Sequence, residues 1–154
     1  MTAYVALVRA VNVSGTGKLP KEALKAMGEA CGFDQCRTFI NSGNLLFASG
    51  LGEAEVKRRI EARVAEHFGK PFPVYVRSAA EMAEAVRRDP FTDDSPSRRF
   101  AHFIDEEPTR KMLDEARDVQ GERLALCPRL IYVSYGEGIA KTKLKLPAVK
   151  NGTA

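Results

Sequence analysis

The sequence contains no tryptophan, two histidines and three cysteines in 154 residues. The odd number and wide spacing of Cys31, Cys36 and Cys127 argue against a disulfide framework, and no Cys-x-x-Cys motif occurs. We therefore expect buried free thiols in a reducing cytoplasm. His67 falls late in an expected helix and His102 in an expected strand, so a Cys/His zinc site has no support, and we predict neither a metal nor a cofactor.

Long apolar runs are also absent. No stretch approaches the roughly 20 apolar residues that a membrane span needs. The N-terminus lacks a basic segment followed by an apolar one, so we predict a cytoplasmic protein without a membrane partner. The net charge of +4 permits anionic partners but is too small for a nucleic-acid signature. The chain is long enough for one ordinary domain or two very small ones.

The first half of the chain alternates between strand and helix patterns. Apolar, β-branched runs predict strands at 4–11, 36–40, 45–48 and 73–76. Helical spacing of apolar residues predicts helices at 20–31 and 53–68, which Gly32 and Gly69 end. The order βαββαβ is the ferredoxin-like, split βαβ motif.

A helix and a polar stretch follow this motif. Ser78-Ala79-Ala80-Glu81 matches a capping box and predicts a helix to about Arg88. A polar stretch marked by prolines, residues 89–97, comes next. We predict a first unit at 1–78, a connecting helix and linker at 79–97, and a second unit at 98–154.

The second half repeats the element order incompletely. Patterns predict strands at 100–104, 123–127 and 130–135, a helix at 108–117 and a short helix near 142–145. This order is βαββα, one element short of a second copy. The expected fold class is α+β, with tandem ferredoxin-like units of which the second is incomplete at the C-terminus.

The first strand is apolar on both faces. One face would carry Tyr4, Ala6, Val8 and Ala10, and the other Val5, Leu7, Arg9 and Val11. Such a strand needs cover on both sides. We expect helices of its own half to cover one face, and the second half or another subunit to cover the other. Arg9 must reach the rim or pair with an acid, because an unpaired buried guanidinium is very costly.

Two glycine-bearing turns follow strands, at residues 12–18 and 41–44. In a βαββαβ sheet the first two strands run parallel, so both turns open at the same edge, and Asn12, Ser42 and Asn44 could face one ligand. The first turn is not a nucleoside-triphosphate loop, because Asn12 and Leu19 occupy positions that need glycine and Ser/Thr. It still leads into a helix N-terminus, which favours anions, although both turns also suit ordinary connections.

Other motifs are less specific. Tyr4 and Phe47 lie on the central strands, where an RNA-recognition module has stacking aromatics, but the Lys/Arg-Gly-Phe pattern is missing. The basic cluster at 141–145 suits a phosphate or carboxylate clamp or a solvated helix face. No Ser/His/Asp, Cys/His or paired-carboxylate pattern occurs, so no hydrolytic mechanism is indicated.

Three segments resemble the bacterial domain-of-unknown-function 1697 family. Residues 4–13 resemble its Leu-Arg-Gly-Ile-Asn-Val-Gly-Gly motif, and residues 37–47 its Arg-Thr-Tyr-Ile-Gln-Ser-Gly-Asn-Val-Val-Phe motif. Residues 135–144 are similar to its Gly-Ile-Gly-Arg-Ser-Lys-Leu segment. The resemblance implies a cytoplasmic protein with two ferredoxin-like units in tandem. It also implies a continuation beyond Ala154, since family members carry an Arg-Asn-Trp-Asn-Thr motif there.

The resemblance also points to candidate ligand-binding residues. Carried over by motif position, they are Arg9, Asn12, Gly15, Arg37, Ser42, Gly43, Asn44 and Lys143. The chain departs from the family at Ala10 and Ser14, where the pattern has glycine, and at Asn41 and Thr142. The two lost glycines weaken a close approach of the backbone to a ligand.

We hypothesise a protein that binds a small anionic or nucleotide-like ligand at the edge formed by the 12–18 loop and the 41–44 turn. One alternative is an enzyme acting on such a ligand, with Arg9 or Lys143 as charge stabiliser. Another is a nucleic-acid or protein interaction module that uses the sheet face. The sequence is also compatible with a homo-oligomer.

Overall fold

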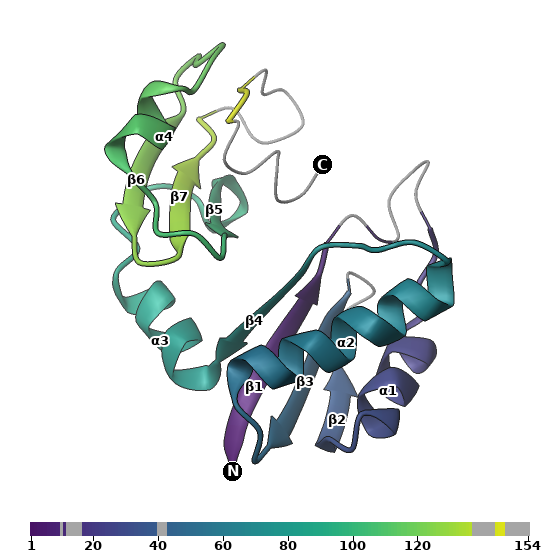
Figure 1. Ribbon diagram of the computed structural model, residues 1–154. Helices are drawn as coiled ribbons and strands as arrows, with labels where there is room; N and C mark the ends of the chain where they lie inside the picture. The colour runs from purple at the N-terminus through teal and green to yellow at the C-terminus, as the bar shows by residue number, and fades with distance from the viewer. Residues whose placement is uncertain (10, 12–16, 40–42, 137–143, 147–154) are drawn as a thin grey trace. The chain divides into compact units, whose positions relative to one another are not determined.

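The computed structural model describes residues 1–9, 11, 17–39, 43–136 and 144–146 (Figure 1). These residues form two separate antiparallel sheets and four α-helices, so the predicted α+β class is confirmed. By their contacts they divide into unit 1, Met1–Met82, and unit 2, Ala83–Ala154. The division falls inside helix α3, Ala79–Arg87.

Unit 1 has the βαββαβ order that its sequence predicts. Its elements are β1 (Thr2–Val8), α1 (Lys21–Ala30), β2 (Asp34–Thr38), β3 (Asn44–Ser49), α2 (Glu53–Phe68) and β4 (Val74–Ser78). The sheet order is β2-β3-β1-β4, and each neighbouring pair is antiparallel. Since β1 and β2 both run against β3, they are parallel to each other. Helices α1 and α2 cover one face of this sheet (Figure 1).

The covered face holds the core of unit 1. Alternate residues of β1 point into it, and Ala6 is fully buried between the ladders. From α2, Val56, Ile60 and Val64 are fully buried against them. The expectation that helices of the first half cover one face of the first strand is therefore confirmed.

Strand β1 is shorter than predicted. It ends at Val8 instead of Val11, because its last partner on β3 is Asn44, the first residue of β3, which directly follows the β2–β3 turn. Once the ladder ends, the strict alternation ends with it. Val11 therefore packs in the core at 4% exposure and not on the opposite face beside Arg9, as the alternation had predicted. Ala10 lies outside the described residues.

All three cysteines are free, as predicted. Cys31 and Cys36 are buried, and Cys127 is half-buried. Burial raises the pKa of both the Cys31 and the Cys36 thiol above its ordinary value. Both therefore remain protonated at neutral pH, which suits structural and unreactive thiols.

The predicted capping box is present at the start of α3. The Glu81 N–H donates to the Ser78 hydroxyl at 3.1 Å, and the Ser78 N–H donates to the Glu81 carboxylate at 3.2 Å. These reciprocal bonds satisfy two donors that a helix N-terminus otherwise leaves open.

Unit 2 contains a three-stranded sheet with the order β5-β7-β6 in its described residues. Its elements are a 3-10 turn (Pro96–Arg98), β5 (Arg99–Phe103), α4 (Arg110–Asp114), β6 (Arg123–Cys127) and β7 (Leu130–Ser134). Helix α4 is shorter than the predicted 108–117. The prediction of a short helix near 142–145 is wrong for the described residues of that range, because Lys145 forms an antiparallel bridge with Arg117. Residues 142–143 lie outside the described residues.

The polar stretch after α3 packs on this sheet. Asp89 pairs with Arg99 at 2.7 Å, and Arg123 pairs with Asp93 at 3.1 Å. The Arg123 guanidinium also stands 4.7 Å from the ring centre of Phe91. The Asp, Ser and Pro residues of this stretch therefore let the chain reverse direction. Its charged side chains hold the stretch on the unit 2 sheet.

Asp94 is partly buried in this stretch, with a side-chain exposure of 19%. Its carboxylate accepts hydrogen bonds from the Ser134 hydroxyl and, at 2.9 Å, from the Ser95 N–H. These bonds, with the nearby Arg123 and Arg98 charges, lower the pKa of Asp94.

Two features are absent from the part of the chain that the structure describes. None of its helices is long and apolar enough to cross a membrane. No group of three or more His, Cys, Asp or Glu side chains is arranged there to hold a metal ion.

Replacing Ser78 with alanine should destabilise the protein by about 1 kcal/mol, because the Glu81 N–H loses its capping acceptor. Urea unfolding measures the change. Ser97→Ala is the control, since its hydroxyl contacts only the exposed Ser95 hydroxyl, and a change within about 0.5 kcal/mol is expected. Equal effects of the two substitutions would show that the capping box contributes nothing.

Asp94 should make stability depend on acid pH. Its pKa is lowered in the folded state, so its stabilising contribution is complete above the unfolded value of about 3.9 and is lost as pH falls through the folded value. Asp94→Asn should therefore reduce stability most at neutral pH, and the difference from wild type should shrink below about pH 4. Denaturant unfolding at several pH values measures this, and a difference independent of pH would contradict it.

Candidate functional site: a sheet edge and an open face

The ends of β1 and of the β2–β3 turn lie side by side. Leu7 is paired with Asn44 in the ladder, and the Val8 N–H donates to the Gly43 carbonyl at 2.8 Å. The turn itself is closed by the Phe39 N–H, which donates to the Asn44 carbonyl at 3.2 Å. We call this end of the sheet the turn edge. At the turn edge, the described residues that flank the first predicted turn lie beside those that flank the second.

Gly43 is required for this approach. Its φ is +80°, a left-handed conformation that favours glycine. A Cβ at this position would lie 2.4 Å from the Val8 carbonyl oxygen and 2.9 Å from a Val11 methyl group. No side chain fits at such distances without moving the backbone of β1.

The end of the first loop is fixed at the same edge. A Cβ on Gly17 would lie 2.4 Å from the Phe68 ring, so the loop backbone passes directly over the last residue of α2. Leu19 is buried at 1% exposure, whereas Lys18 between them is exposed. The packing of Gly17 and Leu19 thus holds Lys18 outward at the start of α1.

Arg9 lies just beyond the end of β1. Its N–H donates to the Pro73 carbonyl at 2.9 Å, and its half-buried guanidinium stands 5.7 Å from the ring centre of Tyr75. A cation above an aromatic face is stabilised by the ring quadrupole. The sequence predicted that Arg9 reaches the rim or pairs with an acid, and the structure shows an aromatic partner that the sequence did not predict.

The structure brings together three of the predicted site residues. Arg9, Gly43 and Asn44 lie at the turn edge. Arg37 lies farther from it, on β2 opposite Leu46, which is two residues further along β3 than Asn44. The other four, Asn12, Gly15, Ser42 and Lys143, lie outside the described residues.

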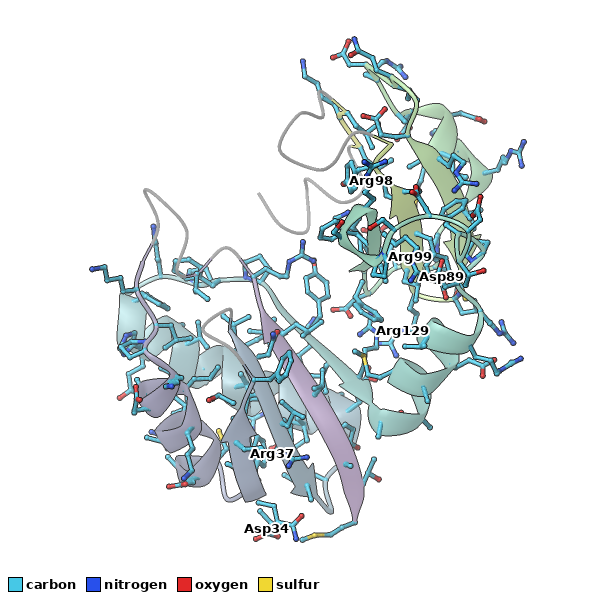
Figure 2. All side chains as sticks on the ribbon, turned by 180° about the vertical axis from the view of Figure 1, so that it is seen from behind. Asp34, Arg37, Asp89, Arg98, Arg99 and Arg129 are labelled. Carbon is cyan, nitrogen blue, oxygen red and sulfur yellow. The ribbon has the colours of Figure 1, made fainter. Side chains whose placement is uncertain are left out.

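Arg37 borders a hollow that no sequence motif predicted. The hollow has a volume of about 670 Å³ and lies on the open face, the face of the unit 1 sheet opposite α1 and α2. Figure 2 views the molecule from behind Figure 1 and shows Arg37 on this face. The residues that line the hollow are Ala3, Tyr4, Val5, Gln35, Arg37, Leu46, Phe47, Ala48, Ala79 and Met82.

One sequence signal did point to this face. The apolar alternation of the first strand predicted that Val5 and Leu7 would need cover, and Val5 lines the hollow. The place of Arg37 had no such signal, because it depends on a bulge in β2 between Asp34 and Arg37, where Gln35 has a φ of +54°.

The open face does not have the aromatic pattern of an RNA-recognition module. The rings of Tyr4 and Phe47 belong to the core, where they stack 5.7 Å apart. Phe33 also stacks on Phe47, with ring centres 4.3 Å apart. The central strands therefore direct their aromatic rings toward the helices, away from the face that such a module uses.

Comparison with known proteins places this fold. The family described as protein of unknown function (DUF1697) matches residues 1–132. The chain belongs to the DUF1697 family. The match confirms the resemblance predicted from the motifs, and segments 4–13 and 37–47 both lie within it.

A solved structure shares the fold of this DUF1697 protein. The conserved bacterial protein SP0830 from Streptococcus pneumoniae superposes with a TM-score of 0.72, over 92% of this chain and 82% of that one. The two are 22% identical, so the likeness concerns the fold alone. No curated protein matches the chain.

Alanine substitutions of three glycines should separate the cost of a left-handed backbone conformation from the cost of a Cβ clash. Gly43→Ala should destabilise by more than about 2 kcal/mol, because it combines a left-handed φ with a clash against Val8. Gly32→Ala has a φ of +83° but open space, and should cost only about 1 kcal/mol. Gly50→Ala has neither problem and should be nearly neutral.

Urea unfolding of the three variants gives this order directly. If Gly43→Ala were no more destabilising than Gly32→Ala, the close approach of the turn to β1 would not exist in solution.

Proposed function

We propose that unit 1 binds a small anionic, nucleotide-like ligand at the turn edge, between the 12–18 loop and the 41–44 turn. The hydrogen bond from Val8 to Gly43 carries this proposal, since it joins the flanks of the two turns in one place. Arg9, Gly43 and Asn44 then lie within one small region.

The charge of the turn edge suits an anion. The described segments that meet there are 8–9, 11, 17–20, 39, 43–44 and 68–73, and they contain no Asp or Glu. They contain three cations, Arg9, Lys18 and Lys70. A cluster of cations creates a potential that attracts anions.

An exposed aromatic ring at the same edge favours a nucleotide-like ligand. Phe39 is 63% exposed, although it is held in the turn by backbone hydrogen bonding to Asn44. A fixed, exposed ring provides a stacking surface for a planar base. In this proposal Arg9 and Lys18 bind the anionic group and Phe39 binds the ring.

The proposal also includes the fold of the whole chain and its location in the cell. We infer two ferredoxin-like units in tandem, divided as 1–78, 79–97 and 98–154, with the second incomplete. The βαββαβ order and strand order of unit 1 support the first copy, and the sheet and helix of unit 2 support part of the second. We also propose a cytosolic protein, which three free cysteines favour.

Pyrophosphate and AMP are the probes that test this function. In ¹H–¹⁵N NMR titrations both should shift the amides of Val8, Arg9, Lys18, Gly43 and Asn44. Lys18→Gln should weaken pyrophosphate binding about fivefold, which corresponds to about 1 kcal/mol for one lost charged contact. Lys111→Gln, an exposed lysine of unit 2, is the control and should change nothing.

The ring is tested by Phe39→Ala. This variant should weaken AMP binding and leave pyrophosphate binding unchanged, because only AMP has a base to stack. If neither probe shifts the turn-edge amides, the proposal fails and an interaction module becomes the better explanation.

A further inference from the structure

We propose that the open-face hollow is a second binding site, for small amphipathic carboxylates. The apolar part of the ligand lies on the floor of the hollow, and its carboxylate pairs with Arg37. This inference does not depend on the turn edge, because none of the residues that line the hollow belongs to that edge.

The floor of the hollow follows from the strand register. Leu46 of β3 is paired with Val5 of β1, and Ala48 is paired with Ala3 one step further along. The two alanines have single methyl groups, so the floor is lower there than at the larger Leu46 and Val5. Met82 of α3 borders the hollow as well. The sheet thus forms a depression with an apolar base.

Among the described residues that line the hollow, Arg37 alone has a charged side chain. It is exposed, and in the part of the chain that the structure describes its guanidinium has neither a hydrogen bond nor an ion pair. No acidic residue is among the lining residues. A cation without a counter-charge beside an apolar floor is complementary to a ligand with one anionic group and an apolar body.

The geometry of an arginine favours a carboxylate. A guanidinium donates two parallel N–H bonds to the two oxygens of a carboxylate. Gln35 lines the same side of the hollow and adds an amide that can donate to the same group. A single arginine on an apolar floor is less suited to a phosphate, whose extra charge would need more donors.

The size of the hollow sets the length of the ligand. From β2, which carries Arg37, to β1 is two strand spacings, roughly 10 Å, which suits a chain of about eight carbons laid across β3. The volume of about 670 Å³ lies in the range of small-molecule sites, which are mostly apolar with a few fixed polar groups.

Octanoate is the probe for this site, followed by ¹H–¹⁵N NMR. Octanoate should shift the amides of residues 3–5, 35–37, 46–48 and 79–82 in a saturable manner. Octylammonium, which has the same chain and the opposite charge, should not bind. Acetate, which has the charge and no chain, should bind at least tenfold more weakly than octanoate.

Two variants separate the charge from the floor. Arg37→Gln should weaken octanoate binding about tenfold, as expected for a lost charge-assisted bidentate contact. Ala3→Leu keeps Arg37 and fills the low part of the floor, and should weaken octanoate binding by a similar factor. Arg63→Gln, an exposed arginine on α2, is the control and should bind octanoate as wild type does.

Several outcomes would overturn the inference. Equal binding of acetate and octanoate would indicate a surface anion contact at Arg37 only. Binding of octylammonium would show that charge plays no part. Shifts of these amides that depend on protein concentration and not on octanoate would show that the open face is an interface between copies. Pyrophosphate shifts at Val8 and Gly43 report on the turn edge separately, so either proposal can fail alone.

Discussion

The central position of β1 is the constraint on which unit 1 depends. β1 is hydrogen-bonded to β3 on one side and to β4 on the other, so every residue from Tyr4 to Leu7 has a partner on both strands. Its covered face contributes the buried Ala6 to the core, its open face contributes Val5 to the hollow, and its end reaches Gly43. One strand therefore positions the core and both proposed sites.

The two proposed sites differ in chemistry because they form at different parts of the same sheet. At the turn edge the ladder ends, and the segments that meet there carry exposed cations such as Lys18. Across the open face the pleat alternates, and the side chains Val5 and Leu46 make an apolar floor. A polar anion suits the first place, and an amphipathic carboxylate with Arg37 as partner suits the second.

In unit 2 the composition of one segment predicts a linker, whereas its contacts show that it packs on the sheet. The 89–97 stretch has the Asp, Ser and Pro content of a linker, yet Asp89 and Asp94 bond to residues of the sheet. The same residue types favour chain reversal and supply carboxylates, and only the neighbouring strands decide whether those carboxylates find partners. Helix α4 ends before Arg117, whose backbone pairs instead with Lys145 of a segment distant in sequence.

The sequence by itself determined the features that depend on neighbours along the chain. These are the βαββαβ order of unit 1, the limits of α2, the Ser78–Glu81 capping box and the membership of the DUF1697 family. Local periodicity and motif spacing contain that information. The tertiary structure alone decided where β1 ends, why Gly43 must be glycine and where Arg37 lies. Each depends on the register between strands distant in sequence, which is set by the close packing of whole faces and not by local spacing.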